Sequence, residues 1–225
     1  KRQVLDGNQI ASVTPGAFSD LAALEVLRLN QNSLTELPAQ MFQGLQSLKT
    51  LDLSFNRVKD FNAQTFDGLA SLVELNLANN TLVEMAPVGL ASLIGLRKLD
   101  LSNNQIANIG FRSLVGLRSV VVLNFENNRI ACIAGNSFRA LAALQIINLR
   151  GNKLSQIHRG VFRGTQSLGT VILDNNQISV IHKKAFVDVP DLAELDLHEN
   201  IIKEVSRAYL GLTDKTYIGG VTVRP

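Results

Sequence analysis

The sequence contains a single cysteine, no tryptophan and only five prolines among its 225 residues. Because Cys132 has no partner, an internal disulfide is excluded, and the cysteine count alone favours a reducing compartment. No apolar run approaches the roughly 20 residues of a membrane-spanning helix; the longest runs only from Ser119 to Phe125. The first residues lack the segments of a signal peptide, so we expect a mature piece or part of a longer protein.

The charges give no strong signal either. The 22 Lys and Arg residues and the 19 Asp and Glu residues leave a formal charge of +3, with both signs mixed along the chain. This balance does not favour a nucleic-acid partner. Glycine-rich phosphate loops and the H-E-x-x-H and C-x-x-C motifs are absent. We therefore predict no enzyme activity, no catalytic residue, no metal site and no cofactor.

Asparagine, in contrast, recurs at a constant interval of 24 residues, without an insertion or deletion between the first and the last. A period of this length is typical of a repeat protein. The asparagine column comprises Asn8, Asn32, Asn56, Asn80, Asn104, Asn128, Asn152, Asn176 and Asn200.

Five apolar columns keep the same interval; in the second unit they are Leu24, Leu27, Leu29, Leu34 and Leu37. The L-x-L pair alternates apolar and variable residues, which is the period of a strand buried on one face. A strand this short is unstable alone, so the units must stack their strands into one parallel sheet, with the rest of each unit as the crossover. The sequence therefore predicts a solenoid of about nine coils.

The asparagines have a structural explanation. Where the backbone turns out of the sheet, its N–H and C=O groups lose their ladder partners, and a carboxamide can satisfy them. We expect a ladder of amides from Asn32 to Asn200. A further column holds aromatic rings that we expect in the core, with leucines at three turns: Phe18, Phe42, Phe66, Leu90, Leu114, Phe138, Phe162, Phe186 and Leu210.

The pattern L-x-x-L-x-L-x-x-N-x-L-x-x-L-x-x-x-x-F-x-x-L resembles the leucine-rich repeat, and pieces such as "PGAFSDL" resemble its typical 24-residue animal extracellular class. Toll-like receptors, Slit and chaoptin-like ectodomains share this class. The resemblance implies a single α/β domain over 1–225: a right-handed horseshoe with the parallel sheet on its concave face and irregular or short helical segments on its convex face. The match is clear over 1–212. The cysteine-rich caps of the class are missing, which suggests a fragment, and 213–225 is a degenerate last repeat or a terminal strand.

The columns that face solvent along the strands are not needed for packing, so we expect binding there. An apolar group with a charged rim is the usual anatomy of a protein-binding patch. The alternative is that these are β-branched residues that simply suit strands. The predicted ligand-binding residues on the concave face are Val121, Val122, Ile146, Ile172, Glu126, Arg150, Asp174 and His198.

A second candidate surface is basic and lies on the returning segments. It can attract a sulfated glycan, an anionic lipid surface or an acidic partner domain, although a solvated convex face explains the same residues. Its members are Arg112, Arg118, Arg139, Arg159, Arg163, Lys183, Lys184 and Arg207.

Histidine and cysteine give only weak signals. His158 and His182 are one unit apart, so we expect them side by side, where two imidazoles could share a metal ion or act together as a pH sensor. No third ligand keeps their register, and surface histidines without a task are the simpler interpretation. Cys132 lies in another column, without an orienting carboxylate, which argues against a cysteine nucleophile.

Asn79-Asn80-Thr81 is a sequon for N-glycosylation, with Asn79 as the acceptor. Together with the repeat class, it favours an extracellular location over the reducing compartment that the lone cysteine suggests. We therefore predict a receptor or adhesion protein that binds a protein ligand through its concave face. A scaffold that self-associates, for example as a homodimer, or binds through its edges or basic convex face is the alternative. A consensus-like design without a natural ligand is disfavoured by the variation in the concave columns.

Overall fold

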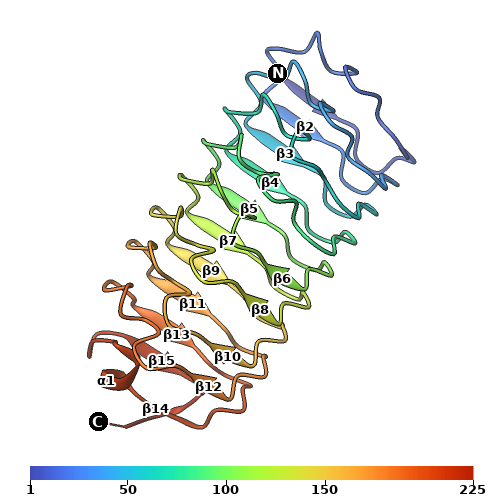
Figure 1. Cartoon of the computed structure of the whole chain (residues 1–225). Helices are drawn as coiled ribbons and strands as arrows, with labels where there is room; N and C mark the ends of the chain where they lie inside the picture. The colour runs from blue at the N-terminus through green and yellow to red at the C-terminus, as the bar shows by residue number, and fades with distance from the viewer. Residues whose placement is uncertain (225) are drawn as a thin grey trace.

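The computed structural model describes residues 1–224 and consists of stacked coils, each of which adds one strand to a ten-stranded parallel sheet. Figure 1 shows these strands side by side from the N-terminal to the C-terminal end of the molecule. In sheet order they are β1 (Arg2–Val4), β2 (Val26–Arg28), β3 (Thr50–Asp52), β4 (Glu74–Asn76), β5 (Lys98–Asp100), β7 (Val122–Asn124), β9 (Ile146–Asn148), β11 (Thr170–Ile172), β13 (Glu194–Asp196) and β15 (Tyr217–Gly219). We call the outer face of this sheet the concave face.

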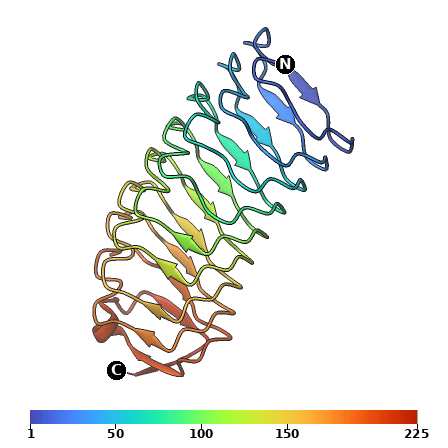
Figure 2. The same ribbon diagram turned by 45° about the vertical axis from the view of Figure 1, so that its right-hand side comes forward.

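The remaining part of each coil is mostly a series of tight turns that return the chain to the next strand. Figure 2 shows the coils stacked one after another from the N-terminal to the C-terminal end of the molecule. Short parallel pairs form on the returning side: β6 (Asn108–Ile109) with β8 (Cys132–Ile133), β10 (Gln156–Ile157) with β12 (Val180–Ile181), and β14 (Glu204–Ser206) with β16 (Thr222–Arg224). The helix α1 (Arg207–Leu210) is the only α-helix within residues 1–224. This architecture confirms the predicted solenoid.

The constant spacing of the sequence becomes an exact strand register. Leu27 pairs with Leu51, and each following strand of the sheet up to β13 repeats that alignment. Leu27, Leu29 and Leu34 are fully buried, as are their equivalents in the central coils, so the repeated apolar columns form one continuous core along the solenoid. Within residues 1–224, no helix has the length and apolar character to cross a membrane.

The asparagine column closes the turn after each strand. Asn104 donates from Nδ2 to the carbonyls of Leu101, Ser102 and, in the preceding coil, Leu77. Its Oδ1 accepts from the backbone N–H of Leu82, also in the preceding coil. The same four bonds recur at each unit from Asn32 to Asn200, so the amides join each coil to its predecessor.

The phenylalanine column packs as two stacks of rings inside the returning segments. Neighbouring rings lie 5.3–6.4 Å apart between centroids, in the runs Phe18–Phe42–Phe66 and Phe138–Phe162–Phe186. Leu90 and Leu114 interrupt the column, and both are buried. Phe61 occupies part of that gap: its ring meets Phe66 edge-on, and a Cβ on Gly89 would come within 2.8 Å of it.

The last coil is one residue shorter than the others. The spacing predicts apolar residues at 216 and 219, where Thr216 and Gly219 stand. In the structure Leu195 pairs with Ile218, which is buried, so the inward position has moved by one residue. Thr216 is buried as well, and its hydroxyl donates to the carbonyl of Leu192. The apparent loss of pattern is therefore a change of register.

Candidate ligand-binding face

In the ten-stranded sheet, each strand from β2 to β13 turns its middle side chain into the core and its two flanking side chains onto the concave face. In β7, Leu123 is fully buried while Val122 and Asn124 are partly exposed. The residue two positions after the second flanking residue, such as Glu126 after Asn124, extends the face beyond the strand. Three outward columns therefore cross the sheet, and most of the predicted binding residues belong to them.

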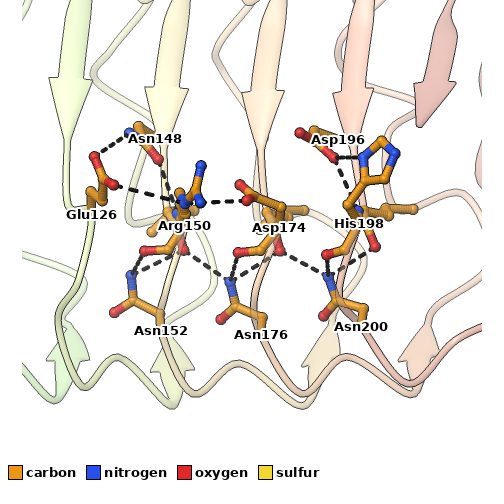
Figure 3. Close-up of polar contacts among 12 residues, drawn as sticks. Glu126, Asn148, Arg150, Asn152, Asp174, Asn176, Asp196, His198 and Asn200 are labelled. Atoms are coloured by element: carbon orange, nitrogen blue, oxygen red, sulfur yellow. Dashed lines mark hydrogen bonds and ion pairs between the residues drawn. The ribbon is translucent and has the colours of Figure 1, made fainter. Parts of the chain in front are cut away.

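A row of charged side chains crosses the C-terminal half of this face (Figure 3). Arg150 lies between two carboxylates: its Nε is 3.3 Å from Asp174 Oδ2 and 3.8 Å from Glu126 Oε1. Glu126 also accepts from Asn148 Nδ2 at 3.3 Å. The row holds alternating charges in place by mutual contacts, so its geometry is set before any partner arrives.

Asp174 is the buried member of the row. Burial raises the pKa of its carboxyl above the ordinary value, and the Arg150 guanidinium opposes that shift. Its Oδ1 is buried without a hydrogen-bond partner in the described part of the chain. Asp174 is therefore an unusually poorly solvated carboxylate for a face that meets water.

The row ends at His198, whose Nδ1 lies 2.6 Å from Asp196 Oδ1. The same oxygen accepts from the backbone N–H of His198, so the histidine is anchored twice. The next strand passes directly beside the ring: a Cβ on Gly219 would come within 2.7 Å of His198 Cε1. Glycine at 219 therefore leaves room for the imidazole.

The predicted apolar group is only partly brought together. Ile146 is 38% exposed, and Val122 and Ile172 are half-buried on neighbouring strands of the same face. Val121 precedes β7 and lines a different hollow, on the flank of the solenoid, beside Arg97 and Gln145. Val121 therefore belongs to the flank and not to the apolar group.

A groove that the sequence analysis did not single out crosses the N-terminal half of the concave face, with a volume of about 350 Å³. Lys98 and Glu74 form an ion pair of 3.0 Å within it. The hydrophobic pattern does not predict this groove, because the shape of the groove depends on the sizes of outward side chains. Its outward lining includes Arg28, Thr50, Asp52, Glu74, Asn76, Lys98, Asp100, Val122 and Asn124.

Part of this face has a structural task. In the column between the strand leucines, Asp and Asn side chains accept the backbone N–H two residues later; Asn124 Oδ1, for example, accepts from Glu126 N at 3.0 Å. That amide has left the sheet and needs an acceptor. Where the column holds Val4, Arg28 or Ile172, an Asp or Asn stands two residues later instead. The same contact is made by Asp52, Asn76, Asp100, Asn148 and Asp196.

A further column escaped sequence analysis: the residue before each ladder asparagine has a positive φ. Gly and Asn adopt this left-handed conformation readily, but bulky side chains rarely do. Gln31, Phe55 and Glu199 are the exceptions, and Phe55, with φ 54°, has a side chain that is 54% exposed. The column comprises Gly7, Gln31, Phe55, Asn79, Asn103, Asn127, Gly151, Asn175 and Glu199.

The other candidates lie outside the concave sheet. The rings of His158 and His182 stack with centroids 4.6 Å apart, and exposed Cys132 shares a small hollow with His158. Among residues 1–224, no group of three or more His, Cys, Asp or Glu side chains is arranged to hold a metal ion. In the basic set, Arg207 differs from the rest, because its guanidinium donates to the Thr216 carbonyl and is partly buried.

Asn79, the predicted glycan acceptor, lies half-buried in the positive-φ column. The Thr81 hydroxyl of the sequon donates to the carbonyls of Arg57 and Val58 in the preceding coil. Any glycan on Asn79 would therefore project from the turn after β4, where the chain leaves the concave face.

Comparison with known proteins now decides the family. The family model described as Leucine rich repeat matches the chain in overlapping segments: 4–58, 24–82, 46–106, 94–154, 118–178, 144–202 and 166–214. The chain belongs to the leucine-rich repeat family. The resemblance drawn from the asparagine and leucine columns is thereby confirmed. No curated protein sequence matches the chain significantly.

Two of the solved structures that share this leucine-rich repeat fold show its relatives. TLR13, in the crystal structure of a TLR13–ssRNA13 complex, is 26% identical with a TM-score of 0.87, over 96% of this chain and 33% of that chain. Toll, in the glycosylated Toll–Spatzle complex of Drosophila, is 22% identical with a TM-score of 0.85, over 99% of this chain and 32% of that chain. The leucine-rich repeat chain thus spans about a third of the length of each.

Proposed function

We propose that this leucine-rich repeat chain is a non-enzymatic recognition surface of an extracellular receptor or adhesion protein, and that its concave face binds a protein ligand. The observation that carries the proposal is the preset charged row from Glu126 to His198, which runs beside the apolar side chains of Val122, Ile146 and Ile172. Fixed polar groups beside an apolar centre suit a protein partner, because little side-chain entropy is lost when it docks.

The charge of the face favours a protein over a nucleic acid. Carboxylates outnumber cations in its three outward columns, and a phosphate backbone would be repelled. The two similar structures hold different kinds of partner, ssRNA13 with TLR13 and Spatzle with Toll. The carboxylates are Asp6, Asp52, Glu74, Asp100, Glu126, Asp174, Glu194 and Asp196, and the cations are Arg2, Arg28, Lys98 and Arg150.

The test uses the chain as bait on material from its native source. Val122→Asp combined with Ile146→Asp places two charges in the apolar centre without touching the core. Proteins held by the original chain should be lost from this variant. Val83→Asp combined with Ile94→Asp is the matched control, since both side chains are 54% exposed and lie outside the concave sheet. Capture that survives Val122→Asp and Ile146→Asp, or that nuclease abolishes, would refute the proposal.

The scaffold alternative has its own readout. A repeat protein that assembles through its edges or returning segments should show the same concentration-dependent mass with or without Val122→Asp and Ile146→Asp. Light scattering during size-exclusion chromatography measures that mass. An assembly whose mass these two substitutions leave unchanged, together with the absence of a captured ligand, would favour the scaffold.

The extracellular assignment rests on the repeat class and on the Asn79 sequon. We expect a fall in mass when protein from its native source is treated with an N-glycosidase, and no such fall for Thr81→Ala, which removes the sequon. A mass that the N-glycosidase leaves unchanged would remove the glycan from the argument and leave the repeat class alone to support the location.

A further inference from the structure

The returning segments of the central coils carry an apolar hollow that the proposed concave site does not use. It has a volume of about 440 Å³ and is lined by Phe111, Val115, Ala140 and Ala142, with Arg118 and Arg139 among its lining residues. Phe111 is 58% exposed and Val115 is 39% exposed, which is unusual for large apolar side chains outside a binding site. The hollow lies beside Leu114, where the phenylalanine column is interrupted.

The floor of this hollow offers no free hydroxyl to a sugar. Ser137 is buried, and its Oγ donates to the carbonyls of Ile109 and Ala134. A sulfated glycan has no apolar group that would fill such a space, whereas an aliphatic or aromatic side chain would. The hollow therefore selects for an apolar anchor.

A second hollow, of about 420 Å³, adjoins the first through Asn136, which lines both. Arg159 and Arg163 line it, with Asp188 as its one carboxylate among the described residues. Arg139 and Arg163 occupy the same position in adjacent coils, so their backbones are only about 5 Å apart. Cations stacked in this way repel one another unless an anion lies between them.

These arginines have no internal counter-ion. Arg118, Arg139, Arg159 and Arg163 are exposed, and none forms an ion pair with another residue of the 1–224 range. On the concave face, in contrast, Arg150 has two carboxylates beside it. The returning segments thus present unpaired positive charge next to an open apolar hollow.

We propose that the two hollows form one docking site for an acidic protein segment. An apolar side chain of the segment enters the hollow of Phe111 and Val115, and its carboxylates pair with Arg139 and Arg163. The site lies away from the ten-stranded sheet, so this partner and a concave ligand bind at the same time. The partner is a protein because neither a glycan nor a phosphate group supplies the apolar anchor.

Fluorescence anisotropy tests the proposal with the full chain. The probe is a short labelled peptide in which a Leu-Phe pair is followed by a run of Asp and Glu. Two control peptides replace either the Leu-Phe pair by Ser-Ser or the acids by Asn and Gln. We expect saturable binding of the probe and at least roughly tenfold weaker binding of each control.

Variants of the chain locate that binding. Phe111→Ser should weaken binding of the probe by about tenfold through lost apolar contact. Arg139→Glu combined with Arg163→Glu should weaken binding of the probe at least as much. Arg57→Glu combined with Lys59→Glu changes the net charge equally but elsewhere, and should leave binding unchanged. All five substituted positions are exposed, and circular dichroism verifies the fold.

Several results would overturn the proposal. Binding of the Ser-Ser peptide as tight as that of the probe would show a general polyanion surface. An unchanged affinity of the Phe111→Ser variant for the probe would show the same. Heparin or anionic phosphatidylserine vesicles that bind with the same dependence on Arg139 and Arg163, but without any on Phe111, would show a glycan or lipid surface instead. An absence of saturable probe binding up to roughly 1 mM would equally reject the site.

Discussion

Each ladder asparagine satisfies backbone groups of two coils with one carboxamide. Asn104 is buried, and its four hydrogen bonds engage three carbonyls and one N–H. Of these, the Ser102 carbonyl also accepts from the backbone N–H of Asn79. The Leu77 and Leu101 carbonyls each accept from a neighbouring ladder asparagine as well. A leucine of similar size would fill the space but leave the Leu82 N–H unpaired and each carbonyl with one hydrogen bond fewer. The requirement is chemical, so an apolar residue cannot replace the amide however well it packs.

We expect Asn104→Leu to destabilise the protein by about 2–4 kcal/mol, because a buried unpaired N–H costs about 1–3 kcal/mol and the three hydrogen bonds to carbonyls are lost as well. Urea unfolding followed by circular dichroism measures the change. Gln105→Leu is the control: it alters the neighbouring amide, which makes no side-chain hydrogen bond within residues 1–224. Equal unfolding midpoints for the two variants would contradict the structural role of the ladder.

Asp174 gives the concave face a pH dependence. Because burial raises the pKa of its carboxyl above the unfolded value of about 4, the folded state binds that proton more tightly. Ionised Asp174 therefore destabilises the fold above this pKa, and the penalty disappears as the pH falls through it. Arg150, which opposes the shift, has a side chain that is 54% exposed and so remains solvated without Asp174.

Asp174→Asn should thus raise the free energy of unfolding near neutral pH and have a smaller effect at about pH 3, where aspartates are largely protonated in both the folded and the unfolded state. Urea unfolding at the two pH values measures both effects. Asp191→Asn, which removes an exposed carboxylate elsewhere, supplies the comparison. A gain that is the same at both pH values, or that Asp191→Asn reproduces, would show that burial of Asp174 is not its cause.

At this scale the sequence predicts the residues that repeat and misses those that vary. The amide column is visible because every coil needs the same chemistry. The positive-φ column is obscured, because Gln31, Phe55 and Glu199 interrupt its glycines and asparagines. The misplacement of Val121 has another cause: strand periodicity gives no warning that its side chain lies before β7, on the flank.

At the scale of elements, the distance between coils is set where turns touch. Gly116 has φ 96°, and a Cβ there would lie 2.4 Å from the carbonyl oxygen of Ala91 in the preceding coil. An added side chain must therefore push two coils apart or distort the turn. Gly135, on a neighbouring coil, has open space around it and no positive φ.

We expect Gly116→Ala to lower stability by about 2 kcal/mol or more, since strain at positive φ adds to the clash with backbone. Gly135→Ala should be neutral within about 0.5 kcal/mol. Thermal and urea unfolding of the pair test this difference. Similar losses in both variants would indicate a general preference for glycine in these turns and not a close approach between coils.

The elements also show the limit of a fixed interval. Spacing predicts every strand of the ten-stranded sheet from β2 to β13, because those coils have equal length. It fails at β15, where the coil is one residue shorter and Ile218 takes the inward place. The charged row was suggested by its columns, but its contacts depend on side-chain reach. The groove from Arg28 to Asn124 depends in the same way on side-chain size, which a hydrophobic pattern does not contain.

At the scale of the whole molecule, each coil contacts chiefly its neighbours, so the solenoid is nearly one-dimensional. Removal of one complete coil should let the flanking coils meet in the same register. Residues 84–107 are such a unit, because residue 108 stands 24 positions after residue 84. The asparagine ladder then continues from Asn80 to Asn128 without a change in its geometry.

We therefore expect the deletion of 84–107 to give a folded protein with the same circular dichroism per residue and a cooperative but earlier urea transition. Deletion of 84–95 alone should abolish cooperative folding, because it removes Leu90 and Leu93 from the core and leaves too few residues for a parallel crossover. Two variants that fold equally well would show that the coils are not the units of this architecture. Two that both fail would show that the central coils, with their interrupted phenylalanine column, are not interchangeable with the rest.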